Sequence, residues 1–131
     1  MNPGVSVIIP AYNAEATLSR AVRSAAGAAG RGPVEEVIIV NDGSVDATPR
    51  IADELARAHG GVRVVHQANR GLAAARNAGL DASRGRLVLF LDADDELMPN
   101  ALANLRLVLA SNPGVGTILG AHLAVHPDGR E

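Results

Sequence analysis

Residues 86–96, Arg-Leu-Val-Leu-Phe-Leu-Asp-Ala-Asp-Asp-Glu, decide the fold class of this chain. Five apolar residues in a row run directly into four acidic residues within five positions. An apolar run of this length without polar alternation is typical of a strand buried on both faces, as in a parallel sheet covered by helices. The acids follow at the carboxyl end of that strand, which is the edge where open α/β sheets bind ligands. We therefore expect an α/β fold with a ligand site beside these acids.

Asp92 and Asp94 are the first candidate metal ligands. Residues two apart on an extended segment project the same way, so both carboxylates can face one ligand. Hard cations such as Mg²⁺ and Mn²⁺ prefer oxygen ligands, and Mg²⁺ is usually held by one or two carboxylates together with substrate phosphates. The pattern therefore predicts a metal and diphosphate site. The alternative is that the acids only favour the positive end of a helix expected from Pro99 to about Ala110.

The composition excludes several classes of protein. The chain has 131 residues, enough for one domain, and its formal net charge of -2 argues against a nucleic-acid surface. All twelve cationic residues are arginines, and the absence of lysine excludes a P-loop and Schiff-base chemistry. The absence of cysteine excludes disulfides, a thiolate nucleophile and zinc-thiolate sites.

No targeting or membrane segment is expected in this chain. Its first residues lack a basic region followed by an apolar stretch, so they do not resemble a signal peptide. The apolar runs are far shorter than the roughly 20 residues that a membrane helix needs. We expect a cytoplasmic protein, or one on the cytosolic face of a membrane if a longer protein carries an anchor.

Strands and helices are predicted to alternate through four rounds, as in a parallel α/β sheet with right-handed crossovers. Pro10 is expected to end the first strand because proline has no N–H for the sheet. Asn13 is expected to cap the first helix, and Thr48 the second, with Pro49 at its first helical position. The predicted strands are Val5–Ile9, Val37–Val40, Val62–Val65 and Leu87–Leu91, and the third and fourth helices are Leu72–Ala82 and Pro99–Ala110.

The last part of the chain departs from this alternation. Residues 115–125 are interpreted as a strand that runs into the turn Pro127-Asp128-Gly129, which would begin a hairpin. The partner strand of that hairpin is not in the sequence, so we expect residues 1–131 to be part of a larger domain. An unfinished sheet edge could also pair two chains into a homo-oligomer.

Four predicted loops converge on one sheet edge, and together they resemble a known family. The loops contain residues 10–13 (Pro-Ala-Tyr-Asn), 41–44 (Asn-Asp-Gly-Ser), 69–77 (Asn-Arg-Gly-Leu-Ala-Ala-Ala-Arg-Asn) and 92–94 (Asp-Ala-Asp). Each motif is short, but their order and spacing over about 90 residues are specific together. In this combination the chain resembles the inverting nucleotide-sugar glycosyltransferases of the family 2 type. The resemblance implies the GT-A fold, a Rossmann-like α/β/α sandwich, with this chain as its nucleotide-sugar-binding portion.

The resemblance assigns the nucleoside to the first three loops. Tyr12 matches the position whose ring packs on the base, and a flat apolar face suits that role. Asp42 matches the acid that accepts a hydrogen bond from the base, although Asp-Gly is also an ordinary turn pair. Arg76 matches an arginine that donates to base carbonyls or phosphate, and otherwise it is an exposed helix residue. The remaining residues implied in nucleotide-sugar binding are Pro10, Ala11, Asn13, Gly71 and Ala93.

The resemblance also divides the acids by role. Asp92 matches the residue that contacts the ribose or the metal, and Asp94 the one that coordinates Mn²⁺ or Mg²⁺ through the diphosphate. Asp95 and Glu96 are interpreted as charges at the start of a helix. The four histidines are interpreted as incidental.

The implied reaction is transfer of a sugar, with inversion, from a nucleoside-diphosphate donor to a hydroxyl of a glycan or lipid-linked acceptor. UDP-sugars are favoured, and polysaccharide or cell-surface glycan synthesis is the implied setting. The family's catalytic base would lie beyond Glu131. The main alternative is a non-catalytic module that keeps the fold for protein contacts. A nucleotidyltransferase would need a glycine-rich loop with a basic residue after the first strand, and residues 10–13 lack one.

Overall fold

The computed structural model describes residues 4–27, 34–120 and 124. Its four strands form one sheet in the order β3-β2-β1-β4, in which every pairing is parallel. The expected α/β class with a parallel sheet is therefore confirmed. The elements are β1 (Val5–Ala11), α1 (Leu18–Gly27), β2 (Val34–Asp42), α2 (Thr48–Ala58), β3 (Val62–Gln67), α3 (Leu72–Ala82), β4 (Leu87–Phe90) and α4 (Ala101–Ser111).

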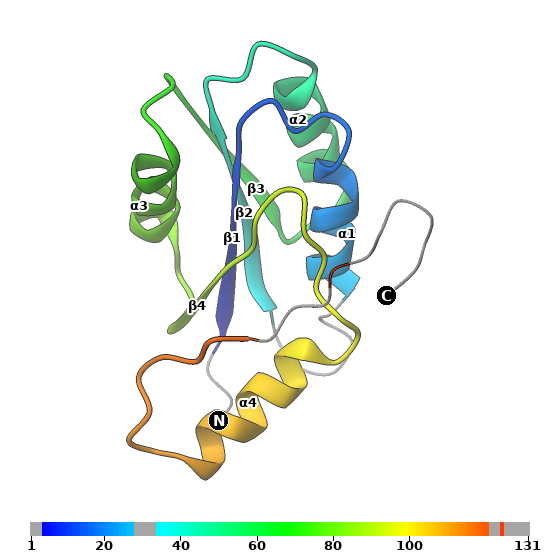
Figure 1. Cartoon of the computed structure of the whole chain (residues 1–131). Helices are drawn as coiled ribbons and strands as arrows, with labels where there is room; N and C mark the ends of the chain where they lie inside the picture. Colours follow the sequence, from blue (N-terminus) through cyan, green and yellow to red (C-terminus); the bar gives the residue numbers. More distant parts are fainter. Residues whose placement is uncertain (1–3, 28–33, 121–123, 125–131) are drawn as a thin grey trace.

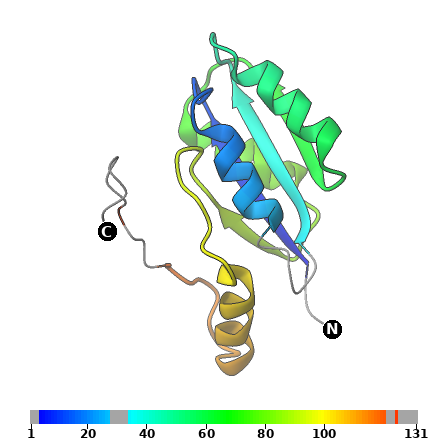
Figure 2. The same ribbon diagram turned by 90° about the vertical axis from the view of Figure 1, so that its right-hand side faces the viewer.

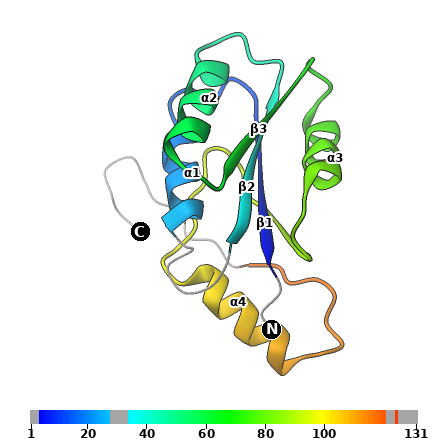
Figure 3. The same cartoon turned by 180° about the vertical axis from the view of Figure 1, so that it is seen from behind.

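The helices cover the sheet on both faces and make three layers. Helices α1 and α2 lie on one face, and α3 lies on the other (Figure 1). Figure 3 shows the same layers from behind, with β3 nearest the viewer. Side chains alternate between the two layers, so Ile8, Ile38 and Val40 pack with Ala75 of α3. Their neighbours Val7, Ile9, Val37 and Ile39 pack in the core on the side of α1 and α2.

The prediction that residues 87–91 are buried on both faces is wrong. β1 and the described part of β2 are buried along their length, whereas Leu87, Val88 and Leu89 are half-buried and Phe90 is 47% exposed. The reason is the strand order. β4 lies at the edge of the described sheet, and α3 lies over β1, β2 and β3 instead. The acids still follow the carboxyl end of a strand, as expected.

Several predicted boundaries also change. Pro10 lies inside β1 and does not end it. Ile8 points its carbonyl to the β4 side, where it accepts from the Leu91 N–H. Pro10 lies two residues further along β1, so its backbone nitrogen faces the same side as the Ile8 carbonyl. The pairing with β4 ends at Ile8 and Phe90, so no hydrogen bond of the sheet is lost where proline lacks an N–H. β2 and β3 both run further toward their carboxyl ends than predicted, to Asp42 and Gln67.

The two predicted helix caps are wrong. Asn13 has a left-handed backbone (φ 48°), and its side-chain oxygen accepts from the Val45 N–H. Helix α1 begins only at Leu18. Thr48 is the first residue of α2, and its hydroxyl accepts from the Ala14 N–H 2.8 Å away. Both side chains therefore bond to the backbone of a different loop, and neither caps its predicted helix.

Helix α4 begins at Ala101, preceded by Asn100, and lies below the amino ends of the strands (Figure 2). Its inner face is the predicted one, because Leu102 is buried and Leu105 packs beside it. The strand expected over residues 115–125 is wrong for residues 115–120, which are not in a strand. The expected turn at 127–129 lies outside the described residues. Among the described helices, none has both the length and the apolar character needed to cross a membrane.

A buried carboxylate fastens the amino edge of the sheet. Glu36 of β2 is 4% exposed and accepts hydrogen bonds from the Ser6 hydroxyl, the Arg84 N–H and the Arg63 guanidinium. Burial opposes ionisation of Glu36, but the hydrogen bonds from Arg63, Arg84 and Ser6 outweigh it and lower the pKa of this carboxyl below its ordinary value of 4.5. Because the Arg63 guanidinium also donates to the Ala82 carbonyl, the network joins three strands to the end of α3.

We expect Glu36→Gln to lower the free energy of unfolding by about 1–2 kcal/mol at neutral pH, because the amide cannot replace a charged acceptor for all of its donors. The effect is limited because Arg63 is partly exposed and can turn toward water. A lowered native pKa stabilises the fold above the unfolded pKa, and this stabilisation is lost as pH falls through the lower native value. In urea titrations at several pH values, the difference between wild type and Glu36→Gln should shrink below about pH 4.5. A constant difference would contradict this role.

Candidate functional site

The loops after β1 and β2 are joined by reciprocal hydrogen bonds at the carboxyl edge of the sheet. The Asn13 N–H donates to the Ser44 hydroxyl (3.0 Å), and the Asn13 side chain accepts from the Val45 N–H (2.9 Å). The Glu15 N–H donates to Asp46, and the Glu15 carboxylate accepts from the Ala47 N–H. These bonds hold residues 13–15 and 44–48 as one unit.

Asp42 joins the loop after β2 to the loop after β3. It is 3% exposed, and its carboxylate accepts from the Gln67 side chain (2.8 Å), the Arg70 N–H (2.9 Å) and the Gly71 N–H (2.9 Å). Burial would raise the pKa of Asp42, but these hydrogen bonds, led by that from Gln67, lower it below its ordinary value of 3.8. Asp42 is therefore held as an ionised carboxylate, bonded to the backbone just before α3 begins.

Gly43 permits the close approach of these two loops. Its φ is +69°, and a Cβ added to it would collide with the backbone nitrogen of Asn69. Only glycine fits a left-handed turn pressed against another backbone segment. The Asp42-Gly43 pair thus acts as a turn, as the alternative interpretation expected, and the same turn fixes the Asp42 carboxylate on residues 70 and 71.

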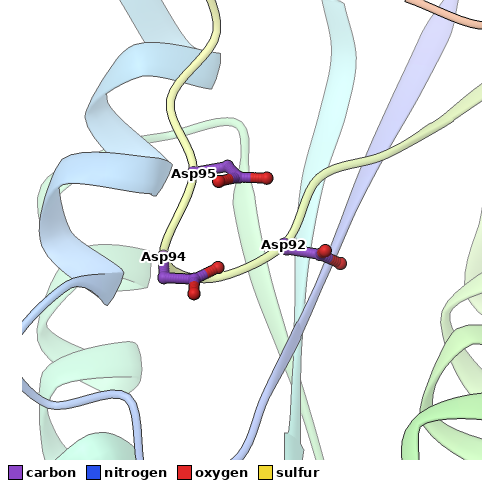
Figure 4. A group of neighbouring side chains, drawn as sticks. All are labelled: Asp92, Asp94 and Asp95. Carbon is purple, nitrogen blue, oxygen red and sulfur yellow. The ribbon is translucent and has the colours of Figure 1, made fainter. Parts of the chain in front are cut away.

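Asp92, Asp94 and Asp95 form an acidic cluster in the loop after β4 (Figure 4). Each offers a carboxylate oxygen, and these oxygens lie within 4.8 Å of one another on exposed side chains. The loop is anchored at its ends by the Leu91 N–H on the Ile8 carbonyl and the Leu97 N–H on the Ser24 hydroxyl. Three carboxylate oxygens at this spacing fit a hard divalent cation such as Mg²⁺ or Mn²⁺.

Arg76 forms an ion pair with this cluster. Its guanidinium donates to Asp92 at 3.2 Å and lies 5.8 Å from the centre of the Phe90 ring. The Arg76 Nε is buried without a partner among the described residues. The pair leaves Asp94 and Asp95 without a cationic partner in those residues, so a metal ion or an added cation has two uncompensated carboxylates to bind.

The structure brings most of the predicted site residues to one edge, with different exposures. Tyr12 is 52% exposed, which leaves its ring free to contact a ligand. Gly71 has a φ of +90° and immediately precedes α3. Pro10, Ala11 and Ala93 have buried side chains, so a ligand would meet only their backbone.

Two residues of this edge have surroundings that differ from those predicted from the sequence. Asp95 is not a helix-start charge, because α4 begins six residues later and Asp95 joins the cluster. The run of four acids is the signal that could identify it. His66, interpreted above as incidental, has ring contacts with both Asn41 and Asp53 that the sequence did not predict. No local pattern indicates those contacts, since they join three different elements.

The sequence matches one family model over most of its length. Residues 6–125 match the model described as Glycosyl transferase family 2. Among similar proteins, the putative glycosyltransferase EpsH of Bacillus subtilis is 41% identical over 98 residues, which are 75% of this chain and 28% of EpsH. The succinoglycan biosynthesis protein ExoO of Rhizobium meliloti is 41% identical over 101 residues, which are 76% of this chain and 28% of ExoO.

Two solved structures share the fold. The mannosyltransferase PcManGT from Pyrobaculum calidifontis, in complex with GDP-Man and Mn²⁺, has a TM-score of 0.80 and 30% identity over 88% of this chain and 34% of its own. S. aureus TarS 1-349 in complex with UDP-GlcNAc has a TM-score of 0.74 and 28% identity over 84% of this chain and 32% of its own. The chain thus spans about a third of the length of these relatives. It belongs to glycosyl transferase family 2 and has the GT-A fold.

Proposed function

We propose that this chain binds a nucleoside-diphosphate sugar, with UDP-sugars favoured, for transfer of the sugar with inversion to an acceptor hydroxyl. The observation that carries the proposal is the acidic cluster of Asp92, Asp94 and Asp95 beside Arg76. The cluster lies at the sheet edge where α/β folds bind ligands. The alternative, a module kept only for protein contacts, predicts no metal-dependent nucleotide binding.

The cluster would hold Mn²⁺ or Mg²⁺, with Asp94 and Asp92 as the principal ligands and Asp95 in reach of the same ion. A divalent ion bound here would neutralise the charge that develops on the leaving diphosphate. Arg76 would donate to a phosphate oxygen as well, because a guanidinium offers several N–H groups and only one hydrogen bond from it, to Asp92, is found in the described residues. The neighbour with GDP-Man and Mn²⁺ supports this assignment.

The nucleoside would lie over the joined loops after β1, β2 and β3. The exposed Tyr12 ring supplies a face on which a base can stack. Asp42 is 3% exposed and both of its oxygens already accept hydrogen bonds, so a base N–H would have to reach the one lone pair left on Oδ2. The complex of TarS with UDP-GlcNAc supports a uridine donor, and the complex of PcManGT with GDP-Man supports guanosine as the alternative.

The acceptor would be a glycan or a lipid-linked sugar in polysaccharide synthesis, and the similarity to the succinoglycan biosynthesis protein ExoO supports this setting. Attack by its hydroxyl needs a general base at neutral pH. The family resemblance puts that base beyond Glu131, so the residues assigned here bind the donor and stabilise the leaving group.

A thermal-shift screen tests the donor site directly. We expect one of UDP, GDP, CDP and TDP, with Mn²⁺ present, to raise the melting temperature by several degrees, because ligand at a hundred times its dissociation constant stabilises the native state by about 2.7 kcal/mol. UDP should give the largest shift. The shift should vanish when the metal is chelated.

Two outcomes of the screen would count against the proposal. No shift with any nucleotide at millimolar concentration would overturn donor binding by this chain. A shift that persists with chelator would support nucleotide binding and overturn the metal assignment. Mn²⁺ without nucleotide is the matched control for stabilisation by the metal alone.

A further inference from the structure

Two hydrogen-bonded side-chain pairs cross from β2 to β3 at their carboxyl ends, one on each face of the sheet. In the register of these strands Asn41 is opposite His66, and Asp42 is opposite Gln67. Gln67 donates to Asp42 on the α3 side. On the α2 side, the Asn41 amide nitrogen lies 3.1 Å from His66 Nδ1. The first pair supports the loop of residues 69–71, and the second has no role in the function proposed above.

The bonding of Asn41 fixes the tautomer of His66. The Asn41 Oδ1 accepts from the Ser44 backbone N–H at 3.2 Å, so the group that faces His66 is the amide nitrogen, a donor. Nδ1 of His66 must therefore accept and carry no proton. The ring proton lies on Nε2, which donates to Asp53 Oδ1 at 2.9 Å.

A chain of hydrogen bonds links His66 to the loop that carries Tyr12. Asn41 is 5% exposed, so its amide has little access to water as a substitute partner. Its oxygen holds the Ser44 N–H, and the Ser44 hydroxyl in turn accepts from the Asn13 N–H at 3.0 Å. Asn13 directly follows Tyr12, and its left-handed backbone sets the direction of that turn.

We infer that His66, as the Nε2–H tautomer, is a positioning residue of the nucleotide site. It orients Asn41, which holds Ser44 and, through it, Asn13 and Tyr12. The inference rests on the proposed function for its effect on nucleotide affinity, whereas the tautomer and the order of the loop can be tested without any nucleotide.

Two substitutions distinguish the contact of His66 Nδ1 from that of Nε2. Asparagine places an acceptor near the position of Nδ1, so His66→Asn keeps the contact with Asn41 and loses Asp53. Glutamine places a donor near the position of Nε2, so His66→Gln keeps Asp53 and loses Asn41. We expect His66→Asn to bind UDP with Mn²⁺ within about twofold of wild type, and His66→Gln to bind about tenfold more weakly, as loss of one hydrogen bond to a buried group implies.

Backbone hydrogen exchange reports the loop itself. In His66→Gln the Ser44 and Val45 amides should exchange about tenfold faster than in wild type, because their acceptors are the side chains of Asn41 and Asn13. In His66→Asn they should exchange at the wild-type rate. His59→Asn is the matched control, since that residue follows α2 and lies outside this chain of hydrogen bonds. Long-range ¹⁵N spectra of wild type at slightly alkaline pH should show Nδ1 unprotonated.

The possible results separate this inference from the proposed function. A protonated Nδ1, or equal exchange in His66→Asn and His66→Gln, would overturn the positioning role whatever the nucleotide does. Failure of wild type to bind any nucleotide would overturn the proposed function, while the exchange rates and ¹⁵N shifts would still decide whether His66 orders the loop. Fast exchange in His66→Gln with wild-type UDP affinity would overturn the link between loop order and binding.

Discussion

Asp94→Ala is expected to abolish the metal requirement for nucleotide binding and to weaken UDP binding with Mn²⁺ by about 100-fold, with the fold unchanged. Asp94 is exposed and has no ion pair in the described part of the chain, so the folded protein loses no internal bond when the carboxylate is removed. What would be lost is one negative ligand for the proposed divalent cation. A contact of this charged kind is worth about 3 kcal/mol, which corresponds to the expected 100-fold change.

Isothermal titration of UDP with Mn²⁺ and with chelator checks this expectation. Asp81→Ala is the matched control, because it removes the same charge from an exposed position of α3 outside the cluster. Its affinity should stay within about twofold of wild type, since exposed charges at a distance are screened by salt. Equal melting temperatures for the two variants would show that the fold is intact. Tight, metal-dependent UDP binding by Asp94→Ala would refute the assignment of Asp94.

The layers of this fold could be predicted from the sequence because apolar periodicity is a local property. Residues 5–9 and 37–40 form central strands as expected, and the spacing of Leu102 and Leu105 identified the inner face of α4. The burial of β4 could not be predicted in this way. An apolar run indicates that a strand can be buried on both faces, but the strand order places β4 at an edge that α3 does not cover.

The convergence of the candidate site residues at one edge of the sheet was predictable for a similar reason. Carboxyl ends of parallel strands meet at one edge, so four loops that follow four such strands must converge there. The bonds that join the loops were not predictable. Asn13 and Thr48 were expected to cap helices, yet each bonds to a loop more than thirty residues away. A cap has a signature in neighbouring residues, whereas a bond between loops depends on how the strands are aligned.

The site that results has two parts held in different ways. On the side proposed for the nucleoside, Asp42, Asn13 and Ser44 are each fixed by hydrogen bonds to backbone groups of other loops. On the side proposed for the phosphates, the acidic cluster is fixed at the ends of its loop, and only Asp92 has a side-chain bond across to another element within the described residues. Preformed contacts lower the entropy lost on binding, so the side proposed for the base is the better organised part of the candidate site.

Asp42→Asn should therefore disturb the fold as well as binding, in contrast to Asp94→Ala. The carboxylate accepts from Gln67, Arg70 and Gly71 through its two oxygens, and an amide offers only one acceptor. In either orientation the amide NH₂ faces a backbone N–H, that of Arg70 or that of Gly71. We expect the free energy of unfolding to fall by about 2–3 kcal/mol at neutral pH, and the melting temperature by roughly 10 °C.

The pH dependence distinguishes this loss from a packing defect. The native pKa of Asp42 is lowered, so its carboxylate stabilises the fold above the unfolded pKa, and the stabilisation is lost as pH falls through the native value below 3.8. Urea titrations should show the full difference between wild type and Asp42→Asn at pH 7 and a smaller one in acid, whereas Asp81→Asn should differ little from wild type at either pH. Because the loop of residues 70 and 71 leads into the helix that carries Arg76, UDP affinity should fall with the stability. Wild-type melting by Asp42→Asn would mean that the three hydrogen bonds do not hold the loops together.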